Sequence, residues 1–498
     1  MKKRVYLAYC CAGILLSAAA CAADDPHIRQ VEQGLLPIAA IHPGAQAGIE
    51  DRMRAYGVPG LSVAVIDGGR LSWAKGYGVA DAVSRRPVTP DTLFQAASIS
   101  KPISAMGALI LVQQGRIQLD QSVNHALGSW KIPDGTMARG DAVTVRMLLN
   151  HTDGLEHAGS GSYPPFSPAD RLASLPQILR GEPPARRTGV SMAFIPGKTF
   201  AYSAAGYEVL QQLVVDVSGQ TFEQYMQGSV FGPVGMKSST FAVPLPESLR
   251  FRAATGHYAG GERLPGGYRV GPGLAVAGLW TTPTDITKYI LSVQRSYTGA
   301  KDQPLTPARA REMLTPGLGS RGLGPAISGS GQSSRFGHDG FNEGFESSFV
   351  AYEGRGQGAV VMANSGFAFM LIKEVLSSVS RAYGWPDYGA TTQQPPSATL
   401  AQQRVSPVSP AILTAAVGHY AMGNTRITLS RGQGRLLLDW PSNGIAEVFA
   451  APDGRLFCAP LIFSDVGSPW LKLVRDSDGR VTQVLAGDDG SIELARLD

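Results

Sequence analysis

Strand-like segments at two distant places along the chain most constrain its fold. Leu61–Ile66, a turn at Asp67–Gly69 and an extended run through Tyr77 to Ala80 predict a β-hairpin of buried strands. Strand patterns return at Ser347–Tyr352 and Ala359–Ala363, with mainly helical segments between the two groups. The sequence therefore predicts an α+β domain, in which an antiparallel sheet built from distant parts of the chain is flanked by helices and joined by a helical lobe.

Four helices are predicted with this sheet. They cover Ala45–Tyr56, Ser98–Gln114, Ala205–Val217 and Phe369–Tyr383. A glycine directly follows each of the first two, which is typical of a helix end. Residues 120–335 are rich in Pro, Gly and polar side chains, and we expect shorter helices there.

The C-terminal part has a different pattern. Residues 389–410 are rich in Pro, Ser, Thr and Gln and carry one charge, Arg404, which indicates a linker. Five short extended runs follow, several separated by Asp-Gly turns: Arg426–Leu429, Arg435–Asp439, Ala446–Ala450, Trp470–Val474 and Ser491–Ala495. We expect one domain over 23–388, a linker over 389–410 and a small all-β barrel over 411–498.

Residues 1–22 have the pattern of a secretory signal peptide. A basic start is followed by an apolar run, Val5–Leu16, and by small residues, Ser17–Ala20. We therefore expect an exported protein, periplasmic in a bacterium or secreted. Ala-Ala-Ala before Cys21 loosely resembles a lipoprotein box without its usual leucine, so we expect membrane attachment only if Cys21 is lipidated.

Charge and cysteine content argue against nucleic-acid binding, disulfides and cysteine metal sites. The formal net charge is +5, and three of these charges lie in the predicted leader, which leaves no electrostatic case for nucleic-acid binding. Cys10 and Cys11 belong to the same leader, and Cys21 lies at its cleavage site. Only Cys458 is internal, so neither an intramolecular disulfide nor a cysteine metal site is expected. The oligomeric state is left open.

The sharpest chemical signal is Ser98-Ile-Ser-Lys101. At helical spacing Lys101 lies one turn after Ser98 on the same face, and Ser98 lies at a helix N-terminus, which favours developing negative charge. The apolar run Ala105–Val112 predicts that this helix is buried, so Lys101 could accept a proton from the serine. Ser72-Trp-Ala-Lys75 has the same spacing but lies in a strand, where residues three apart point to opposite faces.

Two further motifs gain meaning from their order after Ser98. Tyr202 lies shortly before the helix that begins at Ala205. A tyrosine held near a lysine could move a proton to a leaving group. Gly337-His338-Asp339-Gly340 leads into the strand at Ser347. Alone, Tyr202 would be interpreted as a packing residue and His338 as a satisfied polar histidine.

Taken together, the chain resembles the serine β-lactamase and penicillin-binding protein superfamily, in particular the class C-type branch with its related esterases, D,D-peptidases and D-aminopeptidases. The resemblance covers about 45–388, and the C-terminal domain is similar to the lipocalin-like barrel that follows some such hydrolases. The motifs that carry it are Phe94–Lys101, His151–Leu155, Pro196–Ser203, Pro233–Met236, Gly278–Asp285 and Gly337–Gly340.

The resemblance implies a role for each motif residue. Ser98 would be the acylated nucleophile, Lys101 its proton partner and Tyr202 the co-base and leaving-group acid. His338 would replace the family's strand lysine. The backbone N–H groups of Ser98 and Phe341 would form the oxyanion hole. No cofactor or metal is implied, and no Gly-x-Ser-x-Gly elbow of an α/β-hydrolase occurs.

Two departures from the family pattern affect the substrate. Tyr202-Ser203-Ala204 replaces Tyr-x-Asn, and His338-Asp339-Gly340 replaces Lys-Thr-Gly, which makes Ser203, Asp339 and Gly340 candidates for the substrate pocket. A neutral imidazole beside a carboxylate is a poor clamp for the carboxylate of penicillins and D-Ala-D-Ala peptides. We expect an acyl-enzyme hydrolase of small or peptide substrates (an esterase, a D-amino-acid peptidase or amidase, or a weak β-lactamase).

Three alternative interpretations concern the fold and two local motifs. The fold could serve a non-catalytic or slowly acylated module that binds cell-wall peptides. His151-Thr-Asp153 with His157 imitates a metal cluster, but in this family the stretch resembles a structural turn. The glycine-rich run 317–331 has no following lysine or helix pattern of a phosphate site, so we expect a flexible loop near the substrate.

Overall fold

The computed structural model describes most of the chain between residues 26 and 497. The ranges outside the description are 1–25, 37–46, 158–171, 186–187, 259–260, 367, 389–405, 423–424, 433–434, 441–443, 452, 459–469, 488–489, 491 and 498. The predicted signal peptide with Cys21 lies outside the described residues, as does most of the predicted linker. No helix within the described ranges is long and apolar enough to cross a membrane.

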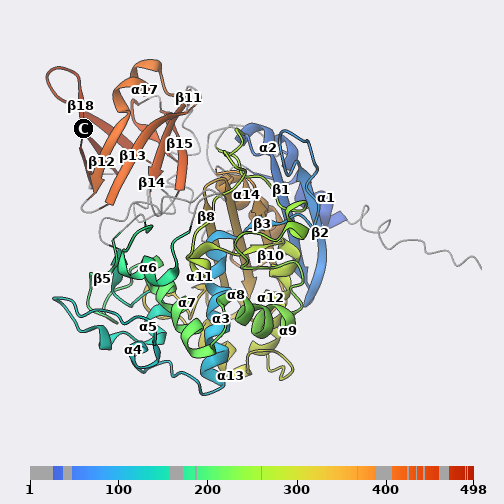
Figure 1. The fold of residues 1–498 in the computed structure, drawn as a ribbon. Helices are drawn as coiled ribbons and strands as arrows, with labels where there is room; N and C mark the ends of the chain where they lie inside the picture. The colour runs from blue at the N-terminus through green and yellow to red at the C-terminus, as the bar shows by residue number, and fades with distance from the viewer. Residues whose placement is uncertain are drawn as a thin grey trace, which may run out of the picture.

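A six-stranded antiparallel sheet forms the centre of the first domain, in the order β2-β1-β10-β9-β8-β7 (Figure 1). Its strands are β1 Gly60–Asp67, β2 Arg70–Gly78, β7 Ala326–Ser328, β8 Arg335–Asn342, β9 Phe345–Tyr352 and β10 Gly358–Ala363. β1 pairs with β10 in the register Val63↔Val361, almost 300 residues apart in the chain. The predicted α+β class, with a sheet of sequence-distant strands, is confirmed.

Helices cover both faces of this sheet because its central strands are apolar on both sides. Val63 and Val361 pack into a cluster with α1, α2 and α14, whereas Val360 and Met362 pack into the cluster that contains α3, α7 and α12. These helices are α1 Pro26–Gln33, α2 Ile49–Tyr56, α3 Ser100–Gln113, α7 Ala204–Ser218, α12 Pro283–Tyr297 and α14 Phe369–Ala382.

Shorter elements complete the helical lobe around α3 and α7. The helices are α4 Val123–Ala126, α5 Val145–Leu149, α6 Leu175–Arg180, α8 Phe222–Met226, α9 Gly232–Val234, α10 Glu247–Arg250, α11 Leu274–Ala277 and α13 Pro307–Leu314. Two small ladders pair β3 Phe94–Gln95 with β6 Trp280–Thr281, and β4 Leu155–His157 with β5 Val190–Met192. Figure 1 shows α3 inside the molecule, between the sheet and the lobe.

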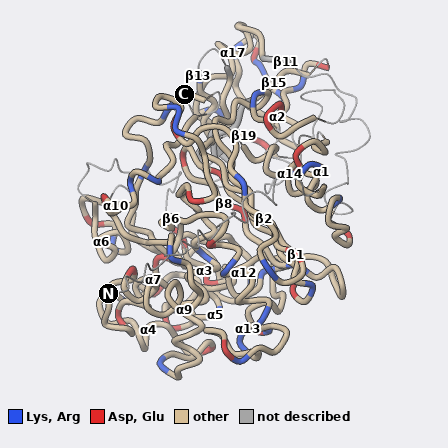
Figure 2. The backbone as a smooth tube through the Cα atoms, turned by 90° about the vertical axis from the view of Figure 1, so that its right-hand side faces the viewer, with Lys and Arg blue, Asp and Glu red and all other residues tan. Residues whose placement is uncertain are grey.

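The C-terminal strands form a closed eight-stranded barrel, which confirms the predicted all-β barrel. They are β12 Gly418–Met422, β13 Thr425–Gly432, β14 Arg435–Trp440, β15 Gly444–Ala450, β16 Leu456–Phe457, β17 Trp470–Arg475, β18 Val481–Ala486 and β19 Ile492–Arg496. Pairing of β15 with β16 closes the ring, and β11 Ser406–Pro407 extends it at β15, followed by α17 Pro410–Ala416. Figure 2 shows that acidic and basic residues are interspersed over the backbone.

Two strands of the central sheet, β7 and β8, were not among the predicted strands. β8 carries two glycines, an aspartate and an asparagine, residues that are depleted in strands, so its composition did not indicate a strand. It becomes a strand because it pairs along its full length with β9 and over Ala326↔Gly337 with β7. His338 therefore lies within the sheet.

Candidate active site

Ser98 lies in a tight turn immediately before α3. Residues Ala97–Ile99 form one turn of 3-10 helix, and Ala97 has φ 49°, a left-handed conformation that side chains other than glycine rarely adopt. Ser100 stabilises this turn, since its hydroxyl donates to the Ala97 carbonyl oxygen at 2.6 Å and accepts the Leu279 N–H at 3.0 Å. Such strain persists where the surroundings enforce it, often at functional sites.

The Lys101 side chain is buried against Ser98, with 1% of its surface exposed. Its Nζ donates to Ser98 Oγ at 3.1 Å and to the carbonyl oxygen of Val276 in α11 at 3.0 Å. The helical spacing predicted from the sequence thus brings these two groups into direct contact. Val276, which no sequence pattern had singled out, orients the Lys101 Nζ through its backbone carbonyl.

Tyr202 completes a cluster with the lysine. Lys101 Nζ lies 4.8 Å from the centre of its ring, and the His151 ring packs on it with centroids 4.4 Å apart. His151 Nδ1 accepts the Ser203 N–H at 3.0 Å, and its carbonyl oxygen accepts the Ala201 N–H at 2.9 Å. His151 therefore positions the segment that carries Tyr202.

His338 joins this cluster from β8. Its ring centre lies 6.2 Å from that of Tyr202. Nδ1 bonds to the carbonyl oxygen of Asp339, so Nδ1 carries the proton, and buried Nε2 has no hydrogen-bond partner within the described chain. Burial, together with the charges of Arg321 and Lys101, lowers the pKa of His338 to about 3, so the imidazole is neutral.

The residues next to His338 alternate between the two faces of the sheet. The Asp339 carboxylate accepts from Lys373 Nζ of α14 at 2.8 Å and from Ser348 Oγ at 2.6 Å, and the Phe341 ring packs on Phe369 of α14 at 5.3 Å. The structure therefore does not support the expectation that the Asp339 side chain lines the substrate pocket. A strand period of two, which directs Asp339 and His338 to opposite faces, is the reason.

Gly340 lies against the turn that holds Ser98. A Cβ at this position would be 2.3 Å from the Ala96 carbonyl oxygen and 3.2 Å from the Ala97 Cβ. Only glycine allows β8 to approach Ser98 so closely. This contact brings the backbone at Phe341 near the nucleophile, as an oxyanion hole would require.

Ser203 has a structural position. Its hydroxyl accepts the Gly206 N–H at 2.8 Å, which caps α7, and donates to the Leu155 carbonyl oxygen at 2.9 Å. With both functions of the hydroxyl used and 5% of the residue exposed, Ser203 does not present a free group to a pocket. The expectation that it contacts substrate is not supported, because an N-cap of α7 needs this oxygen.

Two ionisable groups at the site had no predicted catalytic role: Asp153, which was named only in a metal-like pattern, and Arg321. Burial raises the pKa of Asp153 to about 7, and this carboxyl lies beside the start of α7 at Gly206. Arg321, from the glycine-rich run, lies with its guanidinium carbon 5.6 Å from the Tyr202 ring centre. The glycines in that run drew attention to phosphate binding, and the arginine among them was overlooked.

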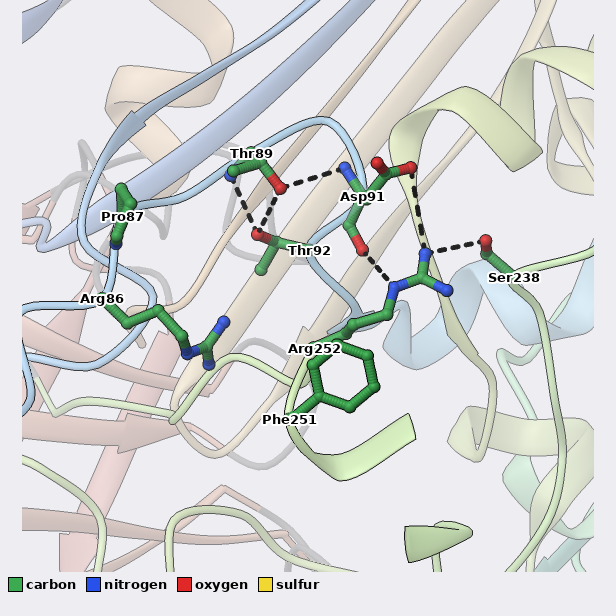
Figure 3. A pocket seen from close by; sticks show the side chains of 8 residues that line it. All are labelled: Arg86, Pro87, Thr89, Asp91, Thr92, Ser238, Phe251 and Arg252. Carbon is green, nitrogen blue, oxygen red and sulfur yellow. Dashed lines mark hydrogen bonds and ion pairs between the residues drawn. The ribbon is translucent and has the colours of Figure 1, made fainter. Parts of the chain in front are cut away.

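No other cluster in the described parts of the chain competes with this site. No group of three His, Cys, Asp or Glu side chains there could hold a metal ion. A separate surface hollow of about 530 Å³ contains none of the site residues (Figure 3). It is lined by Arg86, Pro87, Thr89, Asp91, Thr92, Ser238, Phe251 and Arg252. In this hollow Arg252 donates to the Asp91 carbonyl oxygen and to Ser238 Oγ, so its guanidinium is already hydrogen-bonded within the protein.

Comparison with known proteins agrees with this geometry. A family model described as Beta-lactamase matches residues 45–371. Esterase EstB from Burkholderia gladioli is 28% identical over 319 residues, which cover 58% of this chain and 79% of EstB. Protein flp from Staphylococcus aureus (strain MW2) is 25% identical over 193 residues, 39% of this chain and 37% of flp.

A solved structure extends the likeness to the whole fold. The octameric penicillin-binding protein homologue from Pyrococcus abyssi superposes with a TM-score of 0.56 over 90% of this chain and 97% of that chain. The two sequences are 20% identical, so this likeness concerns the fold alone.

Proposed function

Since the chain belongs to the Beta-lactamase family of serine hydrolases, we propose that it is an esterase that works through a covalent acyl-enzyme on Ser98. One observation carries the proposal: Lys101 Nζ donates to Ser98 Oγ at 3.1 Å inside an almost fully buried helix. A serine is a weak nucleophile until a neighbouring group accepts its proton. Few structural roles would bury a lysine against a serine hydroxyl.

In the proposed reaction, Ser98 Oγ attacks the ester carbonyl carbon while its proton passes to the Lys101 amine. The tetrahedral intermediate collapses by breaking the bond to the leaving oxygen. Tyr202, which lies against Lys101, donates its proton to that oxygen and takes up the proton held by Lys101. An alcohol leaves, an acyl-Ser98 remains, and both side chains return to their starting protonation. Water then attacks the acyl-enzyme by the same steps, releasing the carboxylic acid and restoring the Ser98 hydroxyl.

The negative charge on the intermediate would be stabilised by backbone N–H groups. Those of Ser98 and Phe341 are the candidates, because Gly340 lets β8 lie directly against the turn at Ala96–Ala97. His338, neutral and with Nε2 unoccupied by protein groups, takes the place of a strand lysine beside Tyr202. It can hydrogen-bond the substrate without adding a charge.

Esters suit this site better than penicillins. Penicillins carry a carboxylate that a charged strand residue would hold, whereas His338 is neutral and Asp339 is paired with Lys373. EstB is an esterase by name, which supports the same choice. D-amino-acid amides and weak β-lactam hydrolysis are the alternatives within the same mechanism.

Export belongs to the same proposal. Residues 1–22 would be removed during secretion, or residues 1–20 if Cys21 becomes a lipidated N-terminus that anchors the protein. N-terminal sequencing of the processed protein tests this: a start at residue 21 or 23 is expected, and an uncleaved Met1 would contradict it.

A fluorophosphonate probe tests the enzymatic function. The expected result is a label on the peptide with Ser98, turnover of 4-nitrophenyl esters, and loss of both in Ser98→Ala. Ser72→Ala is the matched control, since it alters the other Ser-x-x-Lys pattern and should retain both. Absence of label and turnover would favour a binding module for cell-wall peptides, and faster turnover of nitrocefin than of esters would overturn the ester preference.

A further inference from the structure

The guanidinium of Arg321 lies at the candidate active site without a counter-charge. Its carbon is 5.6 Å from the ring centre of Tyr202 and 5.7 Å from that of Phe200. Among the described residues, its side chain makes no ion pair and no hydrogen bond with the protein. Its cationic group is thus held by aromatic faces, which leaves its N–H groups available.

Three other arginines of this domain are paired with carboxylates within the fold. Arg52 pairs with Glu374 at 3.1 Å, Arg146 with Glu312 at 2.9 Å, and Arg269 with Glu343 at 3.0 Å. Arg86 and Arg116 lack a carboxylate but donate to the backbone carbonyl oxygens of Ala253 and Val217. Among the described residues, Arg321 differs from all five because its guanidinium contacts only aromatic rings. Guanidinium groups in such positions are suited to bidentate binding of a carboxylate.

The charges around Arg321 also favour binding of an anion. His338 is neutral, and the Asp339 carboxylate is occupied by Lys373. Burial keeps Asp153 largely protonated below neutral pH. The described part of the site thus has more positive than negative charge, which favours an anionic substrate group.

The backbone holds Arg321 in place beside the sheet. Arg321 forms an isolated bridge with Ala326, which in turn pairs with Gly337 next to His338. Arg321 therefore lies beyond edge strand β7, about 10 Å from β8 by the usual strand spacing. Gly319 packs on the Phe200 ring, where a Cβ would lie 2.4 Å from the ring carbon, and its φ of 63° also requires glycine.

We propose that Arg321 binds a carboxylate of the substrate, so that this site prefers acidic esters over neutral esters of the same shape. The proposal rests on the esterase function proposed above and refines it. A carboxylate held on β8, as penicillins need, is still not expected. The anion would lie further out, between β7 and Tyr202.

Two matched ester pairs test this with the full-length protein. 4-Acetoxybenzoate and its methyl ester differ by a charge on the leaving group, and 4-nitrophenyl hydrogen suberate and 4-nitrophenyl methyl suberate differ by a charge on the acyl part. For at least one pair, Arg321→Gln should reduce the acid-to-neutral ratio of kcat/KM by about 10- to 100-fold, the range for one charge-assisted contact. The neutral ester should change by less than about threefold.

Controls separate this contact from general effects of charge. Arg355→Gln removes an exposed arginine from the β9–β10 turn and should leave both ratios unchanged. Added salt should lower the acid preference of the unaltered protein, because screening weakens an exposed ion contact. Unchanged ratios in Arg321→Gln, with neutral esters still hydrolysed, would overturn the inference and leave the esterase proposal intact.

A binding measurement covers the case in which no ester is turned over. Ser98→Ala should bind the acidic suberate ester more tightly than the neutral one by calorimetry, and Ser98→Ala/Arg321→Gln should lose that difference. Binding with this pattern but without turnover in the unaltered protein would support the carboxylate site and contradict the esterase. Equal binding of both esters by Ser98→Ala would contradict the carboxylate site.

Discussion

At the scale of single residues, identical sequence patterns have different chemistry because their surroundings differ. Lys101 and Lys75 both follow a serine by three positions. Lys101 is buried and donates to Ser98, whereas the Lys75 side chain is 49% exposed and pairs with Glu32. Only the first arrangement can take a proton from a serine hydroxyl.

This difference predicts opposite results for one substitution made at two places. Lys101→Met should lower kcat for a 4-nitrophenyl ester by about 10²- to 10⁴-fold, the range for loss of a positioned proton acceptor. Lys75→Met should change kcat by less than about twofold, because it removes only an exposed ion pair. Steady-state kinetics of both variants check this, and an equal loss in the two would contradict the role of Lys101.

His338 predicts a pH dependence of stability. Its pKa is about 3 when folded, mainly because of burial, against an ordinary value of 6.5. The unfolded chain therefore binds a proton more readily, and the stability that the neutral imidazole contributes is present above pH 6.5 and is lost as pH falls toward 3. Between pH 7 and 4.5, the protein should lose about 2 kcal/mol of unfolding free energy relative to His338→Gln.

Urea unfolding of both proteins at the two pH values measures this difference. The variant serves as the reference because the other titrating groups are shared. Parallel pH curves for the two proteins would show that His338 is not held neutral by the fold.

At the scale of elements, β8 connects sheet formation with the proposed catalysis. Its pairing with β9 directs His338 toward Tyr202 and Asp339 toward Lys373. Gly340 follows these two residues in the strand and sets how closely the strand approaches Ala96. The strand thus determines both the side chain and the backbone groups offered to Ser98.

Gly340→Ala adds only a methyl group, but it should reduce activity strongly. The new methyl group would meet the Ala96 carbonyl oxygen at 2.3 Å and displace β8 from the Ser98 turn. We expect a loss of about 1–3 kcal/mol in unfolding free energy, as for overpacking, and a fall in kcat of about tenfold or more. Denaturant unfolding and ester kinetics measure the two effects.

Gly354→Ala is the matched control, because a Cβ there has no atom within 4 Å. It should alter stability by less than about 0.5 kcal/mol and leave kcat unchanged. If Gly340→Ala kept full activity, close approach of β8 to Ser98 would not be needed for catalysis.

At the scale of the whole molecule, the two ends of the first domain are joined by a buried ion pair. Arg52 of α2 pairs with Glu374 of α14 at 3.1 Å, and Tyr56 donates to the same carboxylate at 2.5 Å. The groups are more than 300 residues apart in the chain, and the paired strands β1 and β10 are almost 300 apart. This contact fixes the helical layer that covers one face of the sheet.

Arg52→Met should lower the unfolding free energy by about 3–5 kcal/mol, because it leaves Glu374 buried without its counter-charge. Specific activity of the folded fraction should remain, since neither residue belongs to the candidate site. Lys75→Met, which breaks an exposed pair, should cost less than about 1 kcal/mol in the same urea titration. Similar losses in both variants would contradict the importance of burial.

The sequence by itself determined the fold class, the all-β character of the C-terminal barrel and the pairing of Ser98 with Lys101, because these follow from periodicity and from spacing along one helix. The tertiary structure alone decided contacts between distant segments. It turned the loop-like run at Arg335–Asn342 into a strand, directed Asp339 to Lys373, and brought Arg321 over Tyr202. Pairing between strands and packing between loops depend on partners far along the chain, and no local pattern reports them.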